Sequence, residues 1–419
     1  MAAVEVDLGE THADLTSHDT FVSGVPHGTF KRLRDEDPVS WTPEVDGSGF
    51  WSVTRYADVQ KVAGDYQTFS AARGIRLEEM SEEEIANRRT LMETDPPEHT
   101  RLRRLVNRGF TPRVVLSYEA AIRELAANVL DDALPLGTFD YVTEVARKLP
   151  MRMLGRLLGI PDSDGEWLVQ KGDAMIANTD PEFTDHPVGL TDTDEYRLLP
   201  FRSPAAIEIF EYAEKAARER RENPGDDIIS RLLSRTIDGE PLTDLEFKNF
   251  FALLIAAGND TTRYSLAAGL HRLMHEPGVM DHWRADPGVG ESIVEEIFRT
   301  TTVTMHFRRT ATVDTELSGT PIRAGDKVVM WFVSANHDER QFPDPFRFDP
   351  LRTPNDHVTF GGRGPHFCMG AWLARLEVRV VFEELLKRTR SIEPAGDIER
   401  LRSNFISGIK HLPVTVEMA

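Results

Sequence analysis

Residues 360–370 read FGGRGPHFCMG and hold the only cysteine of the chain, Cys368. A lone cysteine forms no internal disulfide, and one thiol falls far short of the Cys/His set of a structural zinc site. Glycines crowd the stretch before Cys368, and a helical pattern with Leu373, Leu376 and Val380 on one face begins directly after it. The pattern therefore predicts a cysteine at a helix N-terminus, where the helix dipole and free N–H groups favour a thiolate.

Two roles for Cys368 are open at this point. A buried free cysteine often serves only as a small hydrophobic side chain. The flanking glycines favour a second role, because they let the backbone approach a large flat cofactor closely. A thiolate on haem iron donates electron density that promotes O–O cleavage in oxygen-activating enzymes. A nucleophilic or disulfide-exchange role is disfavoured, since no second cysteine and no base motif accompanies Cys368.

Charge and composition narrow the function classes. The chain has 419 residues and a net charge of −20, which argues against nucleic acid or an anionic membrane as a partner. No stretch approaches the ~18 consecutive apolar residues of a membrane span. Residues 1–20 carry five acids and neither Lys nor Arg, unlike a signal or transit peptide. Because a single cysteine also suits a reducing compartment, we expect a cytoplasmic protein.

Helix-like patterns dominate the chain. One long helix is the clearest: Thr243 and Glu246 form a capping box, and Glu276-Pro277 ends the apolar pattern that follows. Gly258 and the threonine hydroxyls near the centre of this helix predict a kink or widened turn. Short strands are expected at residues 49–53, 308–313, 320–322 and 327–332 and near 414, and an irregular coil at 342–354.

The fold class expected from these patterns is mainly α with a small β region. No linker or repeat marks a boundary, so residues 1–419 are expected to form a single domain, with residues 1–20 as a flexible N-terminal segment.

The segment FGGRGPHFCMG resembles the haem-binding loop of the cytochrome P450 superfamily. Phe360 stands eight residues before Cys368, one more than the commonest family spacing, and Gly361 takes the usual place. The longer form resembles bacterial members that act on sterols, terpenoids and branched lipids. The resemblance extends from Trp51 to Val414 and implies a haem b held between the long central helix and the cysteine loop, with Cys368 as the iron ligand.

The centre of the long helix, AGNDTT at residues 257–262, resembles the acid–alcohol motif of the family. The resemblance implies that Asp260 and Thr261 are catalytic and relay protons to dioxygen. It also implies a set of cofactor-binding residues, in which arginine forks and histidines meet the haem propionates. These residues are His99, Arg103, Ala257, Arg309, Phe360, His366, Cys368 and Gly370.

Two alternatives stay open for this set. The basic stretch that begins at His99 is, in isolation, equally a solvated helix face. Arg308 competes with Arg309 for the propionate, and the sequence does not decide which side chain points inward.

Glu296 and Arg299 stand on one helix at i,i+3 spacing. Taken alone, such a pair is a surface ion pair that contributes about 0.5 kcal/mol or less. The pair comes before Arg352 and Cys368 in the chain, as the Glu-x-x-Arg helix does in the family, and in this it resembles that helix. The resemblance implies a buried network of Glu296, Arg299 and Arg352 that fixes the coil before the haem loop.

The resemblance also implies a largely apolar substrate pocket, which favours an apolar substrate such as a steroid, terpenoid or natural-product precursor. Two segments, residues 72–92 and 176–199, would form its lid. The pocket residues expected are Phe250, Leu254, Val303, Met305 and Ile406.

The function expected is that of an oxidoreductase: a haem-thiolate monooxygenase that inserts one oxygen atom from O₂ into an unactivated C–H bond, usually as hydroxylation. Its electrons would come from NAD(P)H through ferredoxin reductase and an acidic ferredoxin, which would dock on the basic stretch 99–113, with five arginines and no acid. The alternatives are desaturation, oxidative coupling or peroxygenation on the same fold, or a non-enzymatic haem sensor. The pair Asp260-Thr261 argues against a peroxide-driven enzyme and against a sensor.

Overall fold

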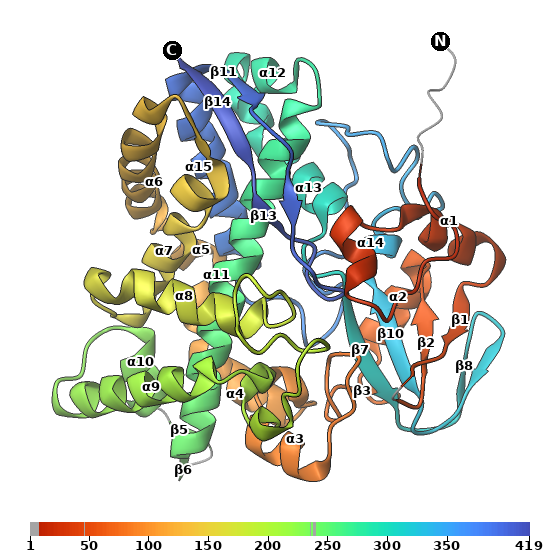
Figure 1. Cartoon of the computed structure of the whole chain (residues 1–419). Helices are drawn as coiled ribbons and strands as arrows, with labels where there is room; N and C mark the ends of the chain where they lie inside the picture. The colour runs from red at the N-terminus through yellow and green to blue at the C-terminus, as the bar shows by residue number, and fades with distance from the viewer. Residues whose placement is uncertain (1–7, 46, 235, 238–239) are drawn as a thin grey trace.

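The capping box at Thr243 begins α11, the long helix around which the other helices are arranged. In this computed structural model the Thr243 hydroxyl accepts a hydrogen bond from the N–H of Glu246, and the Glu246 carboxylate accepts one from the N–H of Thr243. Helix α11 spans Asp244–Met274 and packs against α7, α8, α9, α13 and α15. The long helix predicted from the sequence is therefore confirmed, and Figure 1 shows it crossing the helical part of the molecule.

The kink or widened turn predicted at the centre of α11 does not interrupt the helix. The helix continues through Gly258 as an α-helix, while the Thr261 hydroxyl donates to the carbonyl of Ala257 at 2.9 Å. A carbonyl oxygen has two lone pairs, so it can accept this bond beside its helical one.

The structure describes residues 8–45, 47–234, 236–237 and 240–419. Most of its helices lie on one side of the molecule, with α11 among them, and the larger sheet lies on the other (Figure 1). The helices are α1 (His27–Glu36), α2 (Tyr56–Gly64), α3 (Glu82–Arg88), α4 (Glu98–Asn107), α5 (Pro112–Leu116), α6 (Glu119–Ala133), α7 (Lys148–Leu158), α8 (Gly165–Ile176), α9 (Ala205–Glu222), α10 (Ile228–Ser234), α11 (Asp244–Met274), α12 (Val279–Ala285), α13 (Gly290–Thr301), α14 (Phe332–Ala335) and α15 (Ala371–Arg388).

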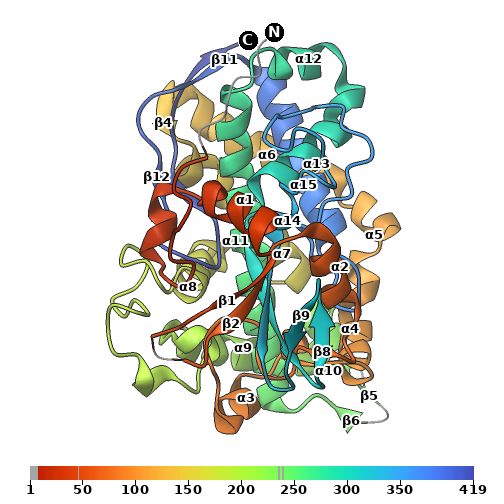
Figure 2. The ribbon, with the colours of Figure 1, turned by 90° about the vertical axis from the view of Figure 1, so that its right-hand side faces the viewer.

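The β region consists of one five-stranded sheet, ordered β1-β2-β10-β7-β3, and smaller sheets ordered β11-β14-β4, β12-β13, β5-β6 and β8-β9. Figure 2 views the five-stranded sheet from the side opposite the helices. The strands are β1 (Val39–Thr42), β2 (Phe50–Val53), β3 (Phe69–Ser70), β4 (Thr138–Asp140), β5 (Thr236–Ile237), β6 (Glu240–Pro241), β7 (His306–Ala311), β8 (Thr315–Leu317), β9 (Thr320–Ile322), β10 (Lys327–Trp331), β11 (Thr389–Pro394), β12 (Glu399–Arg400), β13 (Ile409–His411) and β14 (Pro413–Met418).

The mainly α fold with a small β region is thus confirmed, and strands β2, β7, β9, β10 and β14 coincide with predicted ones. The remaining short strands were missed, because two to six residues carry little periodicity of their own. The coil predicted at residues 342–354 is also confirmed, since residues 336–370 between α14 and α15 form turns and coil.

A buried ion pair on α13 fixes this coil. The Arg299 guanidinium bonds both carboxylate oxygens of Glu296, at 2.8 and 2.7 Å, and both side chains are fully buried. Arg299 also donates to the carbonyls of Asn336 and Pro345, at 2.8 Å each. The Glu296 carboxylate accepts further bonds from the Arg352 guanidinium at 3.2 Å. The three predicted network residues therefore meet at one point.

Residues 8–20 differ from the flexible segment expected there. Leu15 is buried, the Asp19 carboxylate pairs with the Arg402 guanidinium at 2.5 Å, and the N–H of Asn404 donates to His18 at 3.1 Å. Local composition hides these bonds, because the partners lie close to the other end of the chain. Residues 1–7 lie outside the described residues.

Within the described part of the chain, no helix combines the length and the apolarity that crossing a lipid bilayer requires.

Removing one member of the ion pair on α13 should destabilise the whole protein. Arg299→Met leaves the Glu296 carboxylate buried without its main partner, which should lower the free energy of unfolding by about 3–5 kcal/mol. The matched control is Lys31→Met, which breaks an exposed pair with Asp35 and should cost about 1 kcal/mol or less. Urea unfolding followed by circular dichroism measures both, and equal effects of the two substitutions would contradict the role of the network.

Candidate active site

A cavity of about 240 Å³ lies between α11 and the loop that carries Cys368. Helices α4, α7, α11, α13 and α15 and strand β7 contribute to its wall. Thr261 faces it from α11, and Cys368 faces it from the opposite loop. Its lining is mostly apolar, and the charged or titratable residues in it are His99, Arg103, His366, Cys368 and Glu377.

The loop that presents Cys368 is closed by a backbone bond from the N–H of Cys368 to the carbonyl of Phe360, at 2.8 Å. Gly361, Gly362 and Gly364 all have φ between 67° and 119°, a region that side chains with a Cβ rarely adopt. A Cβ on Gly364 would also stand 2.2 Å from the carbonyl oxygen of the neighbouring helix α2. Glycine is therefore required at this point of the loop.

The place of Phe360, one residue farther from Cys368 than usual, has a structural basis. Its carbonyl closes the loop, and its ring lies 4.9 Å from that of Phe298 and 4.4 Å beneath the Arg375 guanidinium. The longer spacing thus still anchors the loop on α13 and α15.

The Cys368 thiol opens onto the cavity, where its surface is exposed, while protein surrounds it on the other sides. Burial raises the pKa of the thiol. The N–H groups of Gly370 and Ala371 and the charges of Arg103 and Arg375 oppose that shift and favour the thiolate. The site is therefore built to hold a thiolate once an electropositive partner sits in the cavity.

Two histidines, the buried His99 and the half-buried His366, meet at one edge of the cavity. The rings of His99 and His366 lie 4.3 Å apart. His99 Nδ1 and both ring nitrogens of His366 are buried without a well-formed hydrogen bond, although His366 lies near the Thr94 carbonyl. Burial lowers the pKa of His99 to about 4 and that of His366 to about 2. Such polar atoms require partners, and an anionic group in the cavity would provide them.

The arginines of β7 point to opposite sides, as successive strand residues do. The Arg308 side chain donates to the carbonyls of Glu78 at 2.6 Å and Arg73 at 2.8 Å, away from the cavity. Arg309 is buried near the two histidines, and burial lowers the pKa of its guanidinium to about 10. It lies behind the residues that line the cavity, and only a bond to the backbone of Arg308, at 2.8 Å, is recorded for it among the described residues.

The predicted proton-relay residues diverge around α11. Thr261 lines the cavity, whereas the Asp260 carboxylate faces α8 and pairs with Arg263 at 3.0 Å. Arg263 also bonds Asp173 of α8 at 2.6 Å. Burial first, and then the nearby Asp173 carboxylate, raise the pKa of Asp260 well above its usual range. Asp260 can therefore hold a proton near neutral pH.

Glu377, which sequence reasoning missed, is a second buried acid at the cavity. It lies on α15, and burial raises its pKa to about 8, while a hydrogen bond with the Thr262 side chain opposes the shift. The signal in the sequence is weak: Glu377 follows Leu373 by one helical turn, on the apolar face of a helix.

Three of the five residues predicted for the substrate pocket lie at the cavity. Phe250, Leu254 and Val303 line the cavity, together with the predicted Ala257, Phe360 and Gly370. Met305 and Ile406 do not line it. Met305 is fully buried in a cluster with residues of β10, and Ile406 pairs with Thr304 in an isolated β-bridge. The side-chain direction of irregular segments is not readable from the sequence.

The cavity has a cysteine thiol on one wall, unpartnered basic groups at its edge and apolar side chains elsewhere. This lining fits a flat cofactor that is anionic at its rim and carries a metal that binds sulfur. Haem b has these properties. The fold and the site thus define a haem-thiolate protein.

Comparison with known proteins gives the same result. A family model described as cytochrome P450 matches residues 22–286 and 290–415. The chain is 38% identical over 401 residues, 93% of this chain and 91% of the relative, to a methyl-branched lipid omega-hydroxylase of Mycobacterium tuberculosis (strain H37Rv). It is 36% identical over 414 residues, 96% of this chain and 92% of the relative, to a steroid C26-monooxygenase of the same strain.

Solved structures agree in fold. The structure is similar to that of Mycobacterium marinum cytochrome P450 CYP268A2 in complex with pseudoionone, with a TM-score of 0.88, 36% identity, and coverage of 98% of this chain and 100% of that one. The chain belongs to the cytochrome P450 family. It is a monooxygenase that binds haem b, takes electrons from a redox partner and hydroxylates an apolar small molecule with O₂.

The buried carboxyl of Glu377 should make stability depend on pH. Between its ordinary pKa near 4.5 and the raised value of about 8, the folded state holds the proton and the unfolded state releases it, so the wild type loses stability as pH rises through this window. Glu377→Gln removes that loss and should be more stable than the wild type by about 1–3 kcal/mol near pH 7.5, with a smaller gain near pH 5.

Denaturant unfolding of the holoprotein at several pH values measures this gain. The control is the exposed Glu124 on α6, whose replacement by Gln should leave the pH profile unchanged. A gain for Glu377→Gln that stays constant from pH 5 to pH 8 would count against a raised pKa.

Proposed function

We propose that this enzyme hydroxylates the terminal carbon of a methyl-branched or sterol side chain. The observation that carries the proposal is the apolar wall of Phe250, Leu254 and Val303 around the space between Thr261 and Cys368. Such a wall takes a hydrocarbon end and not a polar one. The names of the relatives, omega-hydroxylase for methyl-branched lipids and C26-monooxygenase for steroids, support the same class of substrate.

Haem b, when bound, supplies the oxidising chemistry. Cys368 would hold the iron through its thiolate. His99, His366 and Arg103, which line the cavity, would meet the carboxylates of the cofactor rim, and Arg309, near the two histidines, would add its positive charge. Ala257, Phe360 and Gly370, all in the cavity wall, would contact the flat faces.

Thr261 and Asp260 would manage protons. The Thr261 hydroxyl lies at the cavity and donates to the Ala257 carbonyl at 2.9 Å, which leaves its lone pairs free to accept. Asp260, one residue earlier, holds a proton because burial and Asp173 raise its pKa. Rotation of the Asp260 side chain away from Arg263 would bring that proton from the α8 side toward the cavity.

The electron donor would be a ferredoxin served by an NAD(P)H-dependent ferredoxin reductase. Arg104, Arg108 and Arg113 are exposed along α4 and α5, on a protein that is strongly acidic overall. This local positive charge suits an acidic partner. We also propose that the protein is cytoplasmic and that residues 1–419 form one catalytic domain.

The substrate class can be tested directly with the purified holoenzyme, a surrogate ferredoxin, its reductase and NADPH. Isopalmitic acid, a methyl-branched long-chain fatty acid, and cholesterol are suitable probes. We expect the terminal alcohol as the main product, because the apolar wall admits the hydrocarbon end to the space between Thr261 and Cys368. Gas chromatography with mass spectrometry identifies the position, and a spread of internal alcohols or an absence of turnover with both probes would refute the proposal.

Thr261→Ala should keep the cofactor and the substrate affinity but lose coupling. Without the hydroxyl, product formed per NADPH should fall roughly tenfold to hundredfold, the range of a lost proton-transfer group, while hydrogen peroxide rises. Thr261→Ser is the control, since it restores the hydroxyl and should recover most of the coupling. The proton-relay role fails if the Ala and Ser variants couple equally well.

A further inference from the structure

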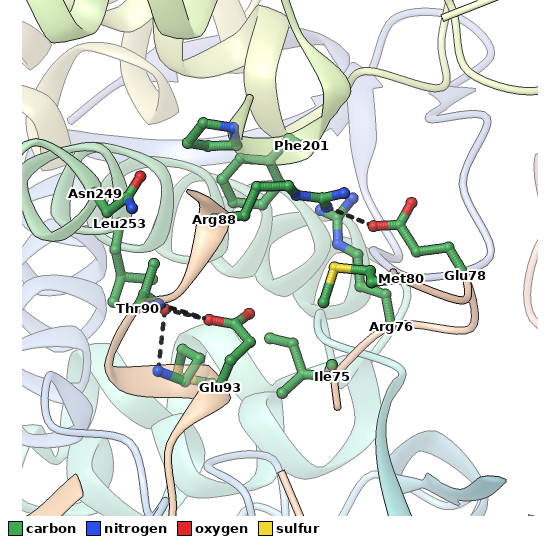
Figure 3. A pocket seen from close by; sticks show the side chains of 13 residues that line it. Ile75, Arg76, Glu78, Met80, Arg88, Thr90, Glu93, Phe201, Asn249 and Leu253 are labelled. Carbon is green, nitrogen blue, oxygen red and sulfur yellow. Dashed lines mark hydrogen bonds and ion pairs between the residues drawn. The ribbon is translucent and has the colours of Figure 1, made fainter. Parts of the chain in front are cut away.

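A second, smaller pocket of about 60 Å³ adjoins the cavity. It shares Met92 and Leu253 with the cavity wall, so the two spaces are neighbours at these side chains. Figure 3 shows the side chains around this pocket. Residues 74–80 and the segment with Thr90 and Glu93 form part of its wall, and Phe201 and two residues of α11, Asn249 and Leu253, form the rest. Both predicted lid segments lie at or next to this pocket.

Arg76 is the unusual residue of this pocket. Its guanidinium lies between two aromatic rings, 4.6 Å from the centroid of Phe201 and 4.5 Å from that of Phe405. Its Nη2 is buried without a hydrogen-bond partner, and among the described residues no carboxylate comes within ion-pair distance. Burial lowers its pKa to about 10, which still leaves it charged at neutral pH. A buried cation without a partner is costly.

The other charged groups of the pocket are already engaged. The Glu78 carboxylate bonds the Arg88 guanidinium at 2.5 Å. The Glu93 carboxylate accepts bonds from the hydroxyl and the N–H of Thr90, at 2.6 and 3.1 Å, and burial raises its pKa, which favours its neutral form. Figure 3 shows these bonds on either side of Arg76. The Glu78 carboxylate favours the charge of Arg76 from beyond ion-pair distance, and the nearby charge of Arg88 opposes it, so neither group gives Arg76 a direct partner.

The backbone near Phe201 supports a built site. Phe201 and Arg202 have φ of 59° and 50°, in the left-handed region. Such a conformation costs a non-glycine residue about 1 kcal/mol or more and tends to occur at ligand sites. Here it brings the Phe201 ring over Arg76. The Arg202 guanidinium pairs with Glu84 at 2.9 Å, which holds the segment in place.

We propose that Arg76 binds the carboxylate head group of the substrate while the hydrocarbon tail passes Met92 and Leu253 into the cavity. The inference rests on the proposed function and narrows it to an amphipathic lipid acid. A guanidinium offers a planar fork of donors that matches a carboxylate, and the rings of Phe201 and Phe405 stabilise its charge while leaving its edge for the ligand. A neutral head group would leave the buried cation uncompensated.

Anchoring the head has a consequence for regiochemistry. Because the carboxylate is held at one end, the opposite end of the chain is the part that reaches Thr261 and Cys368. The preference for the terminal carbon then comes from the distance between Arg76 and the space beside Cys368, in addition to the apolar wall.

The test is a titration of the ferric holoenzyme followed by the spin-state change of the haem spectrum on substrate binding. Isopalmitic acid and its methyl ester form the probe pair, since they share the tail and differ in the charge of the head. For the wild type we expect at least tenfold tighter binding of the acid. Arg76→Met should abolish that preference by weakening the acid alone, with the ester within about twofold of the wild type.

Two further variants complete the design. Arg76→Lys keeps the charge without the fork and should retain part of the preference, which also covers the case in which Arg76→Met fails to fold. Arg73→Met removes an exposed arginine of the same segment and should behave as the wild type. Equal affinity of the wild type for acid and ester, or an acid preference that survives in Arg76→Met, overturns the carboxylate site and leaves the lipid-hydroxylase proposal intact. If neither probe shifts the spin state, the carboxylate site is overturned, and the lipid-hydroxylase proposal fails with it if cholesterol is not turned over either.

Discussion

The ion pair of Glu296 and Arg299 is the interaction on which the site depends. It is fully buried, and its remaining hydrogen-bonding capacity is used by backbone carbonyls and side chains of residues 336–355. Those residues form no regular structure, so no ladder of backbone bonds holds them in place. The charge network does this instead, and it thereby fixes the approach of the loop that ends at Cys368. A pair that looks like a surface ion pair in the sequence is, in the folded protein, buried and bonded to the segment that leads to Cys368.

Buried polar groups in this protein fall into two kinds. Some make several bonds within the protein and leave only one buried nitrogen unpaired: Arg308 bonds three backbone carbonyls, and Arg263 bonds Asp173 and Asp260. Others lack a partner, and His99, His366 and Arg76 are among them. These three lie at cavity edges, where a bound molecule can reach them. Since an unpaired buried group is costly, their position is better explained by ligands than by stability. The proposed partner of the first two is the rim of the cofactor, and the proposed partner of Arg76 is the far end of the substrate.

Much of the fold and the centre of the site could be predicted because their signals are local. The capping box at Thr243, the glycines before Cys368 and the Glu-x-x-Arg spacing are each contained in a few residues, and the structure places them as one unit. What could not be predicted depends on contacts between distant segments. Asp173, which adds to the effect of burial in raising the pKa of Asp260, lies on another helix. Met305 and Ile406 follow no period that gives their direction. Arg76 stands in a charged segment that reads as solvated surface, and only Phe201 and Phe405, far along the chain, turn it into a buried cation.

The two sets of unpartnered groups together constrain how a substrate can lie. The anionic cofactor takes the positive charge near His99 and Arg309, so a substrate acid gains nothing by approaching that edge. The next unpaired positive charge along the apolar cavity is Arg76, on the other side of Met92 and Leu253. Between these points most of the wall is apolar. An acid with a long tail therefore has one orientation in which both its charge and its apolar surface are satisfied, and that orientation presents its terminal carbon to the space between Thr261 and Cys368.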